Sequence, residues 1–159
     1  MTVVSNAGPL IALARIGRLD LFEALFGEVV VPPAVFAEIT RNPDLPGAAD
    51  LEQGTWLVVR PVTDEIAVQR LRFWLDLGES EAIILSQELG ATLLMDERRG
   101  RAIATTLGVR VTGTVGILLA AKHTRHIPAV LPLLDALLAS GIRLSSRLYE
   151  EARRLADES

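Results

Sequence analysis

Two polar residues stand where short apolar segments of the chain end, and their side chains offer oxygen atoms. Asp96 follows the strand-like run Thr92–Met95, and an arginine-rich, helix-forming segment comes directly after it. Asn6 follows Thr2–Ser5 in the same way. In α/β proteins, ligands bind outside the carboxyl ends of the strands. Because hard divalent cations prefer oxygen ligands, this pairing predicts a divalent-metal site.

Further acids lie near the ends of predicted helices. Glu38 lies late in the helix that follows the second apolar run, Glu79 and Glu81 open a later helix, and Glu97 follows Asp96. A few converging carboxylates suffice to bind Mg²⁺, which keeps several of its waters. A metal held in this way activates water and stabilises the charge that develops on a phosphodiester. All of these acids are therefore candidate ligands.

Each candidate also has a purely structural interpretation. Asp96 suits the N-cap position of the helix that follows it. The acids in first helical turns complement the helix dipole, and Glu38 fits an ordinary solvated helix residue. Asn6 before Gly8-Pro9 is typical of a cap or turn. The functional interpretation rests on the combination, with an amide and a carboxylate at the ends of two strands.

The elements that would position these side chains alternate along the chain, which predicts parallel strands joined by helical crossovers. The predicted strands, rich in Val, Ile and Leu with little alternation, are Thr2–Ser5, Glu28–Val31, Trp56–Arg60, Thr92–Met95 and Val109–Thr112. The predicted helices are Pro9–Ile16, Leu19–Phe26, Pro33–Thr40, Ala48–Gln53, Asp64–Asp76, Glu79–Glu88, Glu97–Leu107, Gly113–Lys122, Ala129–Ala139 and Ser146–Ala156. We therefore expect a single three-layer α/β/α domain over residues 1–159, with a central parallel sheet of about five strands.

Composition bounds the class of protein. Half of the 159 residues are hydrophobic and the mean hydropathy is +0.35, which argues against disorder. The absence of cysteine excludes disulfides and thiolate zinc sites. The first residues lack the basic flank and long apolar core of a signal peptide, so we expect a soluble cytoplasmic protein. The net charge of −4 gives no global attraction to nucleic acid, yet 15 of the 16 basic residues are arginine, which binds phosphate bidentately.

Several other function classes lack their motifs. There is no phosphate-binding P-loop, no glycine-rich dinucleotide turn after a strand and no serine-nucleophile elbow. The two tryptophans, Trp56 and Trp74, are expected in the core or an interface. The segment Leu144–Leu155 has apolar residues at helical spacing, and this face either packs on the domain or contacts an antitoxin or a second copy of the chain.

Four runs together resemble PIN domains, the nuclease fold of VapC-type toxins. The first run, Val3–Leu13, contains the letters SNAGPLI at Ser5–Ile11. The other runs, in chain order, are Val29–Ile39, Gly78–Ile83, and Leu93–Arg101 continuing to Val111–Gly116. The resemblance covers most of the chain.

The resemblance implies a five-stranded parallel sheet with the ends of the first and fourth strands close together. It also implies a Mg²⁺- or Mn²⁺-dependent ribonuclease acting on RNA, often a toxin held inactive by an antitoxin protein, and often a homodimer. Carried over by position, the site is Asn6, Glu38, Glu81 and Asp96, all of them metal-binding candidates. The accessory residues are Glu79, Glu97 and Thr114, and the residues available to hold RNA phosphates are Arg98, Arg99 and Arg101.

Asn6 departs from the resemblance, because active members usually carry aspartate there. An asparagine carbonyl still binds a hard cation but brings no charge, and ligand charge is one determinant of affinity. A second hypothesis is therefore a catalytically degenerate PIN-like module that binds protein or RNA. A phosphatase that forms an aspartyl-phosphate intermediate ranks low, because an amide cannot serve as that nucleophile.

Overall fold

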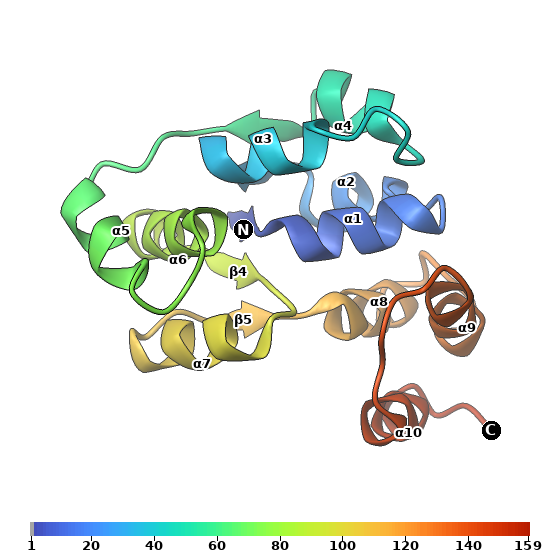
Figure 1. The fold of residues 1–159 in the computed structure, drawn as a ribbon. Coiled ribbons are helices and arrows are strands. Elements are labelled where there is room, and N and C mark those ends of the chain that lie inside the picture. The colour runs from blue at the N-terminus through green and yellow to red at the C-terminus, as the bar shows by residue number, and fades with distance from the viewer. Residues whose placement is uncertain (1) are drawn as a thin grey trace.

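The computed structural model describes residues 2–159 and is built around one parallel sheet (Figure 1). Its strands are β1 (Val3–Ser5), β2 (Val29–Val31), β3 (Leu57–Val59), β4 (Thr92–Leu94) and β5 (Val111–Thr112). The spatial order is β3-β2-β1-β4-β5, and every neighbouring pair is parallel. Helices flank the sheet, so the predicted three-layer α/β/α fold is confirmed.

The strand order places a change of direction between β1 and β4. From β1 the chain builds outward through β2 to β3, and then returns to the other side of β1 for β4 and β5. In such sheets the connections diverge at this point and leave a crevice at the carboxyl ends of the two strands. The residues that follow β1 and β4 therefore border that crevice.

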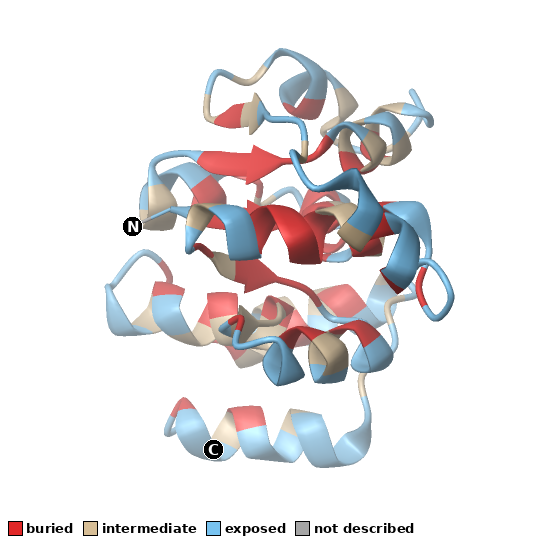
Figure 2. Cartoon of the chain, turned by 90° about the vertical axis from the view of Figure 1, so that its left-hand side faces the viewer, coloured by how far each residue is buried: buried red, intermediate tan, exposed pale blue. Residues whose placement is uncertain are grey.

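The centre of the sheet is buried because its strands carry only apolar or small side chains. All residues of β1 and β2 are buried, as are Leu93 and Leu94 of β4 (Figure 2). Continuous apolar runs without alternation are what a sheet covered on both faces requires. Leu10, Leu13 and Phe22 from the first helices pack against these strands in the same core.

Ten helices are present in residues 2–159, and most predicted boundaries hold within two residues. They are α1 (Ala7–Arg15), α2 (Asp20–Phe26), α3 (Pro33–Thr40), α4 (Ala48–Gln53), α5 (Glu65–Leu71), α6 (Leu77–Leu89), α7 (Arg98–Thr106), α8 (Thr114–His123), α9 (Leu131–Ala139) and α10 (Ser146–Leu155). None of them is long and apolar enough to cross a lipid bilayer.

The prediction of one helix over Asp64–Asp76 is wrong at its C-terminal end. α5 stops at Leu71, and Asp76 is instead the N-cap of α6. The Asp76 carboxylate accepts a hydrogen bond from the Glu79 N–H (2.7 Å), and the Glu79 carboxylate accepts one from the Asp76 N–H (3.0 Å). This reciprocal pair is a capping box. Because of this capping box, α6 begins at Leu77, two residues earlier than predicted. The residues between Leu71 and Asp76 form a connection outside both helices.

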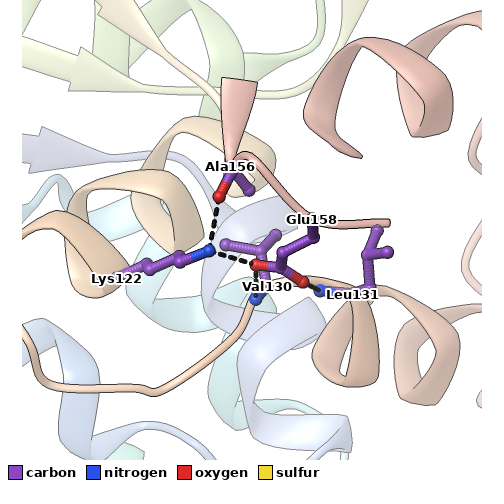
Figure 3. A network of polar contacts seen from close by, with 5 residues as sticks. All are labelled: Lys122, Val130, Leu131, Ala156 and Glu158. Atoms are coloured by element: carbon purple, nitrogen blue, oxygen red, sulfur yellow. Dashed lines mark hydrogen bonds and ion pairs between the residues drawn. The ribbon is translucent and has the colours of Figure 1, made fainter. Parts of the chain in front are cut away.

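A partly buried ion pair fastens the end of the chain to the domain (Figure 3). The Glu158 carboxylate accepts hydrogen bonds from the N–H groups of Val130 (2.7 Å) and Leu131 (2.9 Å) at the start of α9. The Lys122 ammonium of α8 lies 2.9 Å from the same carboxylate and also donates to the Ala156 carbonyl. Burial raises the pKa of Glu158, but these donors lower it by more, so its pKa lies below the ordinary value. One carboxylate thus caps α9 and ties α10 to α8.

We expect Glu158→Ala to destabilise the docking of α10 by about 2–3 kcal/mol, because it leaves Lys122 and two helix N–H groups without their charged partner. In the wild-type protein, acidification should remove the same stabilisation of α10, because it protonates the Glu158 carboxylate. A depressed pKa stabilises the fold above the ordinary value of 4.5, and this contribution disappears as pH falls through the folded-state pKa. Amide hydrogen exchange in α10 measures both effects, and Glu151→Ala is the control at an exposed position of the same helix. Equal exchange in the two variants would contradict this role for Glu158.

Candidate active site

Asn6 and Asp96 come together because their strands are adjacent. Ser5 of β1 is in register with Leu94 of β4, and the Asn6 N–H donates to the Leu94 carbonyl at 2.9 Å. Asn6 stands one residue beyond β1 and Asp96 two residues beyond β4, both at the point where the connections diverge. The ends of β1 and β4 therefore lie side by side, as the sequence predicts.

The Asp96 carboxylate is held by the first residue of a different helix. Its Oδ1 accepts a hydrogen bond from the Thr114 N–H (2.7 Å), and its Oδ2 accepts one from the Thr114 hydroxyl (2.5 Å). Thr114 begins α8 and is itself buried. The interpretation of Asp96 as the cap of the helix directly after it is therefore wrong. Asp96 is instead oriented by the N-terminus of α8, while it remains exposed to solvent.

Asn6 occupies the N-cap position of α1 without using its side chain there. No hydrogen bond joins its side chain to the first turn of the helix, although the residue is only 8% exposed. Its backbone carbonyl accepts from the Ser5 hydroxyl at 2.9 Å. Two residues on, a Cβ built on Gly8 would lie 3.8 Å from Asp96 Oδ2, which places the first turn of α1 against the Asp96 carboxylate. Asn6 thus stands at the N-cap position, as a cap residue would, but its side-chain amide makes no capping hydrogen bond.

Glu38 and Glu81 both lie where α3 packs against α6. Glu81 Oε1 accepts a hydrogen bond from the Ala34 N–H at 3.0 Å, in the first turn of α3. A Cβ built on Gly78 would lie 3.3 Å from Glu38 Oε1, so the Glu38 carboxylate lies over the first turn of α6. Burial, together with the nearby Asp76 charge, raises the pKa of Glu38, and Arg41 opposes the increase. Glu38 is thus half-buried and in an acidic environment, in contrast to a solvated helix residue.

The two accessory acids have structural roles. Glu79 completes the capping box of α6, and Glu97 is the N-cap of α7, where it accepts from the N–H groups of Arg99 (3.0 Å) and Gly100 (2.6 Å).

Sequence reasoning overlooked Asp76, which caps α6 and faces Glu38. The spacing Asp76-Leu77-Gly78-Glu79 is the capping-box pattern that would have identified it.

Glu79 and Glu97 also form a carboxyl–carboxylate pair. Burial raises the pKa of Glu79 to about 7, and the Asp76 and Glu97 charges add to the increase. Burial acts in the same direction on Glu97, but the backbone donors and the Glu79 carboxyl lower the pKa of Glu97 below the ordinary value. Near neutral pH, a protonated Glu79 therefore donates to an ionised Glu97.

This pair predicts a pH-dependent gain of stability for Glu79→Gln. Because the folded-state pKa of Glu79 is raised from 4.5 to about 7, wild type loses stability as pH rises through this range. Glutamine keeps the capping geometry and cannot ionise. We expect the variant to be more stable than wild type by about 1 kcal/mol at pH 8, a value reduced by solvent screening of the half-buried pair, and equal at pH 5. Urea unfolding at the two pH values measures the difference, and a pH-independent difference would contradict the pairing.

A family model for the PIN domain matches residues 2–158, nearly the full length of the chain. The chain belongs to the PIN domain family. Among solved structures, a PilT N-terminus domain protein from the hyperthermophilic archaeon Sulfolobus solfataricus P2 is similar at 16% sequence identity, with a TM-score of 0.49. That match covers 91% of this chain and 98% of the other. A comparison with curated proteins gives no significant match.

PIN domains are generally nucleases, typically act with divalent metal ions, and bind RNA. The donors of this PIN domain are hard oxygens, which suit Mg²⁺ or Mn²⁺ and not a soft metal. Within residues 2–159, no three Asp, Glu or His side chains are gathered closely enough to hold an ion. The candidates instead lie in two places, Asn6 and Asp96 at the ends of β1 and β4, and Glu38 and Glu81 where α3 packs against α6. The oxygens of Asn6 and Asp96 would suit an ion that keeps most of its waters.

The three arginines of the PIN domain's α7 differ in their freedom to bind phosphate. Arg101 donates to the Met95 carbonyl at 2.9 Å and so supports the end of β4. Arg99 makes one long contact with the Trp74 carbonyl (3.4 Å), and Arg98 is exposed. Arg98 and Arg99 therefore retain most of their donors for a ligand, whereas Arg101 is partly committed to the fold.

A cavity of about 530 Å³ opens beside Asp96. Asp96, Arg101 and Thr114 line one end, and the apolar side chains of Leu144, Leu148 and Leu155 line the other. Leu148 and Leu155 belong to α10, where they are 40% and 55% exposed, while Ala152 between them is buried. The apolar face of α10 thus packs on the domain in part and lines this cavity with the remainder.

Proposed function

We propose that this PIN domain is a metal-dependent endoribonuclease of the VapC-like toxin type, which hydrolyses RNA phosphodiesters with Mg²⁺ or Mn²⁺. The observation that carries the proposal is the position of Asn6 and Asp96 at the ends of β1 and β4. There the Asp96 carboxylate is oriented by two hydrogen bonds from Thr114. A strand-end carboxylate fixed in an accessible crevice is suited to binding a cation against phosphate.

In the proposed mechanism Asp96 and Asn6 would hold the ion, and Glu81 and Glu38 would supply further carboxylate oxygens. When bound, the ion supplies Lewis-acid stabilisation of the charge that develops on the phosphate. The Thr114 N–H and hydroxyl keep the Asp96 carboxylate in one orientation. Glu38 accepts a proton from the attacking water, a role for which a raised pKa is favourable because the carboxylate is then a stronger base. Arg98 and Arg99 hold flanking phosphates through charge-assisted hydrogen bonds.

The test is cleavage of a single-stranded RNA by purified protein with added Mn²⁺, and again with EDTA. We expect cleavage that requires the metal and that stops when EDTA is in excess. Metal-independent cleavage, or no cleavage of any RNA in the presence of Mn²⁺, would overturn the proposal.

Asn6 favours a second candidate, a PIN domain that has lost catalysis and binds RNA or protein. In Asn6→Asp, the site gains one anionic ligand, so cation affinity should rise by about tenfold. If the wild-type protein does not cleave RNA and Asn6→Asp does, the natural chain is a binding domain that has lost catalysis. If wild type cleaves and Asn6→Asp changes mainly the Mn²⁺ concentration required, the ribonuclease proposal holds.

The proposal extends to partners and to a cytoplasmic location. The partly exposed Leu148 and Leu155 of α10 offer apolar surface for an antitoxin or for a second copy in a homodimer. The mass of the purified protein by light scattering tests the homodimer directly.

A further inference from the structure

Two adjacent aromatic side chains stand in solvent on the connection between α5 and α6, which is drawn in green in Figure 1. Phe73 is 84% exposed and Trp74 is 60% exposed. Their ring centroids lie 6.0 Å apart at an interplanar angle of 58°. Trp56, by contrast, stacks on Phe22 at 5.6 Å and is half-buried against the core, whereas the exposed Trp74 leaves only the interface part of the expectation for the two tryptophans. An exposed pair of large aromatics marks an interaction surface.

Arginines surround this pair. Arg70 and Arg72 precede it and are exposed, and Arg98 and Arg99 line the hollow next to Trp74. The Arg99 guanidinium donates to the Trp74 carbonyl at 3.4 Å, which fixes α7 against the aromatic turn. Two guanidinium groups beside Trp74, and two exposed arginines just before the aromatic pair in the sequence, match a ligand with phosphates and flat bases. Stacking on aromatic rings with a cationic track is how single-stranded nucleic acid is bound without sequence preference.

The hollow beside Trp74 adjoins residues that neighbour the proposed active site. Its volume is about 620 Å³, and Asp76, Glu79 and Glu97 line it together with Arg98 and Arg99. Glu97 is the residue next to Asp96 in the sequence, and the Asp76 charge helps to raise the pKa of Glu38. The carboxylates already accept backbone N–H groups at the starts of α6 and α7, so the arginines are the groups of this hollow that can donate to phosphates.

We propose that Phe73 and Trp74, with Arg98 and Arg99, form a platform on which single-stranded RNA stacks as it enters the active site. The platform deepens the proposed function and rests on it, because it names the residues outside the ion site that hold the RNA. Its aromatic residues lie outside the ion-binding set, so binding on the platform is separable from cleavage.

The test is titration with a single-stranded RNA octamer in EDTA, followed by tryptophan fluorescence. We expect quenching in wild type, because a base stacks on Trp74. In Trp74→Leu the quenching should disappear, since Trp56 is shielded by Phe22, and the Kd should rise about tenfold or more. Ile66→Ala is the matched control, because it removes a 69% exposed apolar side chain of α5 without touching the pair. Replacing Arg98 or Arg99 by Gln should reduce the slope of log affinity against log salt by about 0.7 for each phosphate that the protein no longer neutralises.

Three outcomes would overturn the platform. One is an unchanged Kd in Trp74→Leu. Another is equal quenching by a blunt duplex. The third is a Trp74→Leu variant that changes from dimer to monomer by light scattering with RNA affinity intact, which would make the pair a protein interface.

Failure of the platform is distinguishable from failure of the nuclease proposal. If cleavage occurs and Trp74→Leu binds normally, only the platform fails. If no cleavage occurs and quenching depends on Trp74, only the nuclease proposal fails.

Discussion

Asp96→Asn should reduce RNA cleavage by about 100-fold or more with the fold intact. The wild-type strand ends hold one amide and one carboxylate, so this substitution leaves two neutral amides at the crevice. Loss of the anionic ligand removes several kcal/mol of stabilisation from a site that acts through a cation. Rates of RNA cleavage at saturating Mn²⁺ measure the effect.

The geometry around Asp96 makes asparagine a matched substitution. An asparagine carbonyl oxygen still accepts from the Thr114 N–H, and the amide nitrogen donates to the Thr114 hydroxyl oxygen. The cap of α8 is therefore kept, and the free energy of unfolding should change by less than about 1 kcal/mol. Cleavage at the wild-type rate in a folded Asp96→Asn protein would remove Asp96 from the mechanism.

Gly113→Ala should reduce cleavage by about 10- to 100-fold without altering any side chain of the proposed ion site. A Cβ at this position would lie 2.7 Å from Asp96 Oδ1 and 2.9 Å from an Arg101 guanidinium nitrogen, so both groups must shift. Displacing a catalytic group by about 1 Å is enough for an effect of this size. The backbone at Gly113 has φ −97°, which alanine adopts without strain, so the fold should persist.

Gly8→Ala is the control on the opposite side of the same carboxylate. Its Cβ would lie 3.8 Å from Asp96 Oδ2, an ordinary van der Waals contact. Because residue 8 is helical and precedes Pro9, alanine brings no gain in helix stability there, and we expect wild-type cleavage with the fold retained. Equal losses of activity in the two variants, or none in either, would show that the position of Asp96 does not limit the reaction.

The layers of the fold were predictable because buried parallel strands are encoded locally. Runs such as Val29–Val31 and Leu93–Leu94 are apolar without alternation, which indicates a sheet covered on both faces. The glycines and prolines between the runs mark where helices start and stop. Strand lengths were overestimated by one or two residues, since local composition does not show where pairing with a neighbour ends.

The adjacency of Asn6 and Asp96 also followed from the sequence, through the rule that parallel strands present their carboxyl ends at one edge. The detailed contacts of the site did not. Asp96 and Thr114 are 18 residues apart, and the pairing of β5 with β4 is what brings the start of α8 beside Asp96. The Glu79–Glu97 pair likewise requires α6 and α7 to approach each other. Without that approach, each acid is indistinguishable from an ordinary acid in a first helical turn.

Trp74 shows a different limit of sequence reasoning. Its neighbours Leu71 and Leu75 are buried, and a helix continued to Asp76 would have placed Trp74 on a regular helical face. The capping box at Asp76 ends that regularity, and the resulting turn directs Phe73 and Trp74 into solvent. A local hydrogen-bonding pattern thus determines whether a large aromatic belongs to the core or to the surface.

Calorimetric titration with Mn²⁺ in the absence of RNA tests the central claim most directly. We predict saturable binding at one site in wild type, weakened about tenfold or more in Asp96→Asn and retained in Glu79→Gln, whose glutamine keeps the cap of α6. Undetectable Mn²⁺ binding in folded wild-type protein, or binding that Asp96→Asn leaves unchanged, would contradict a cation held at the ends of β1 and β4.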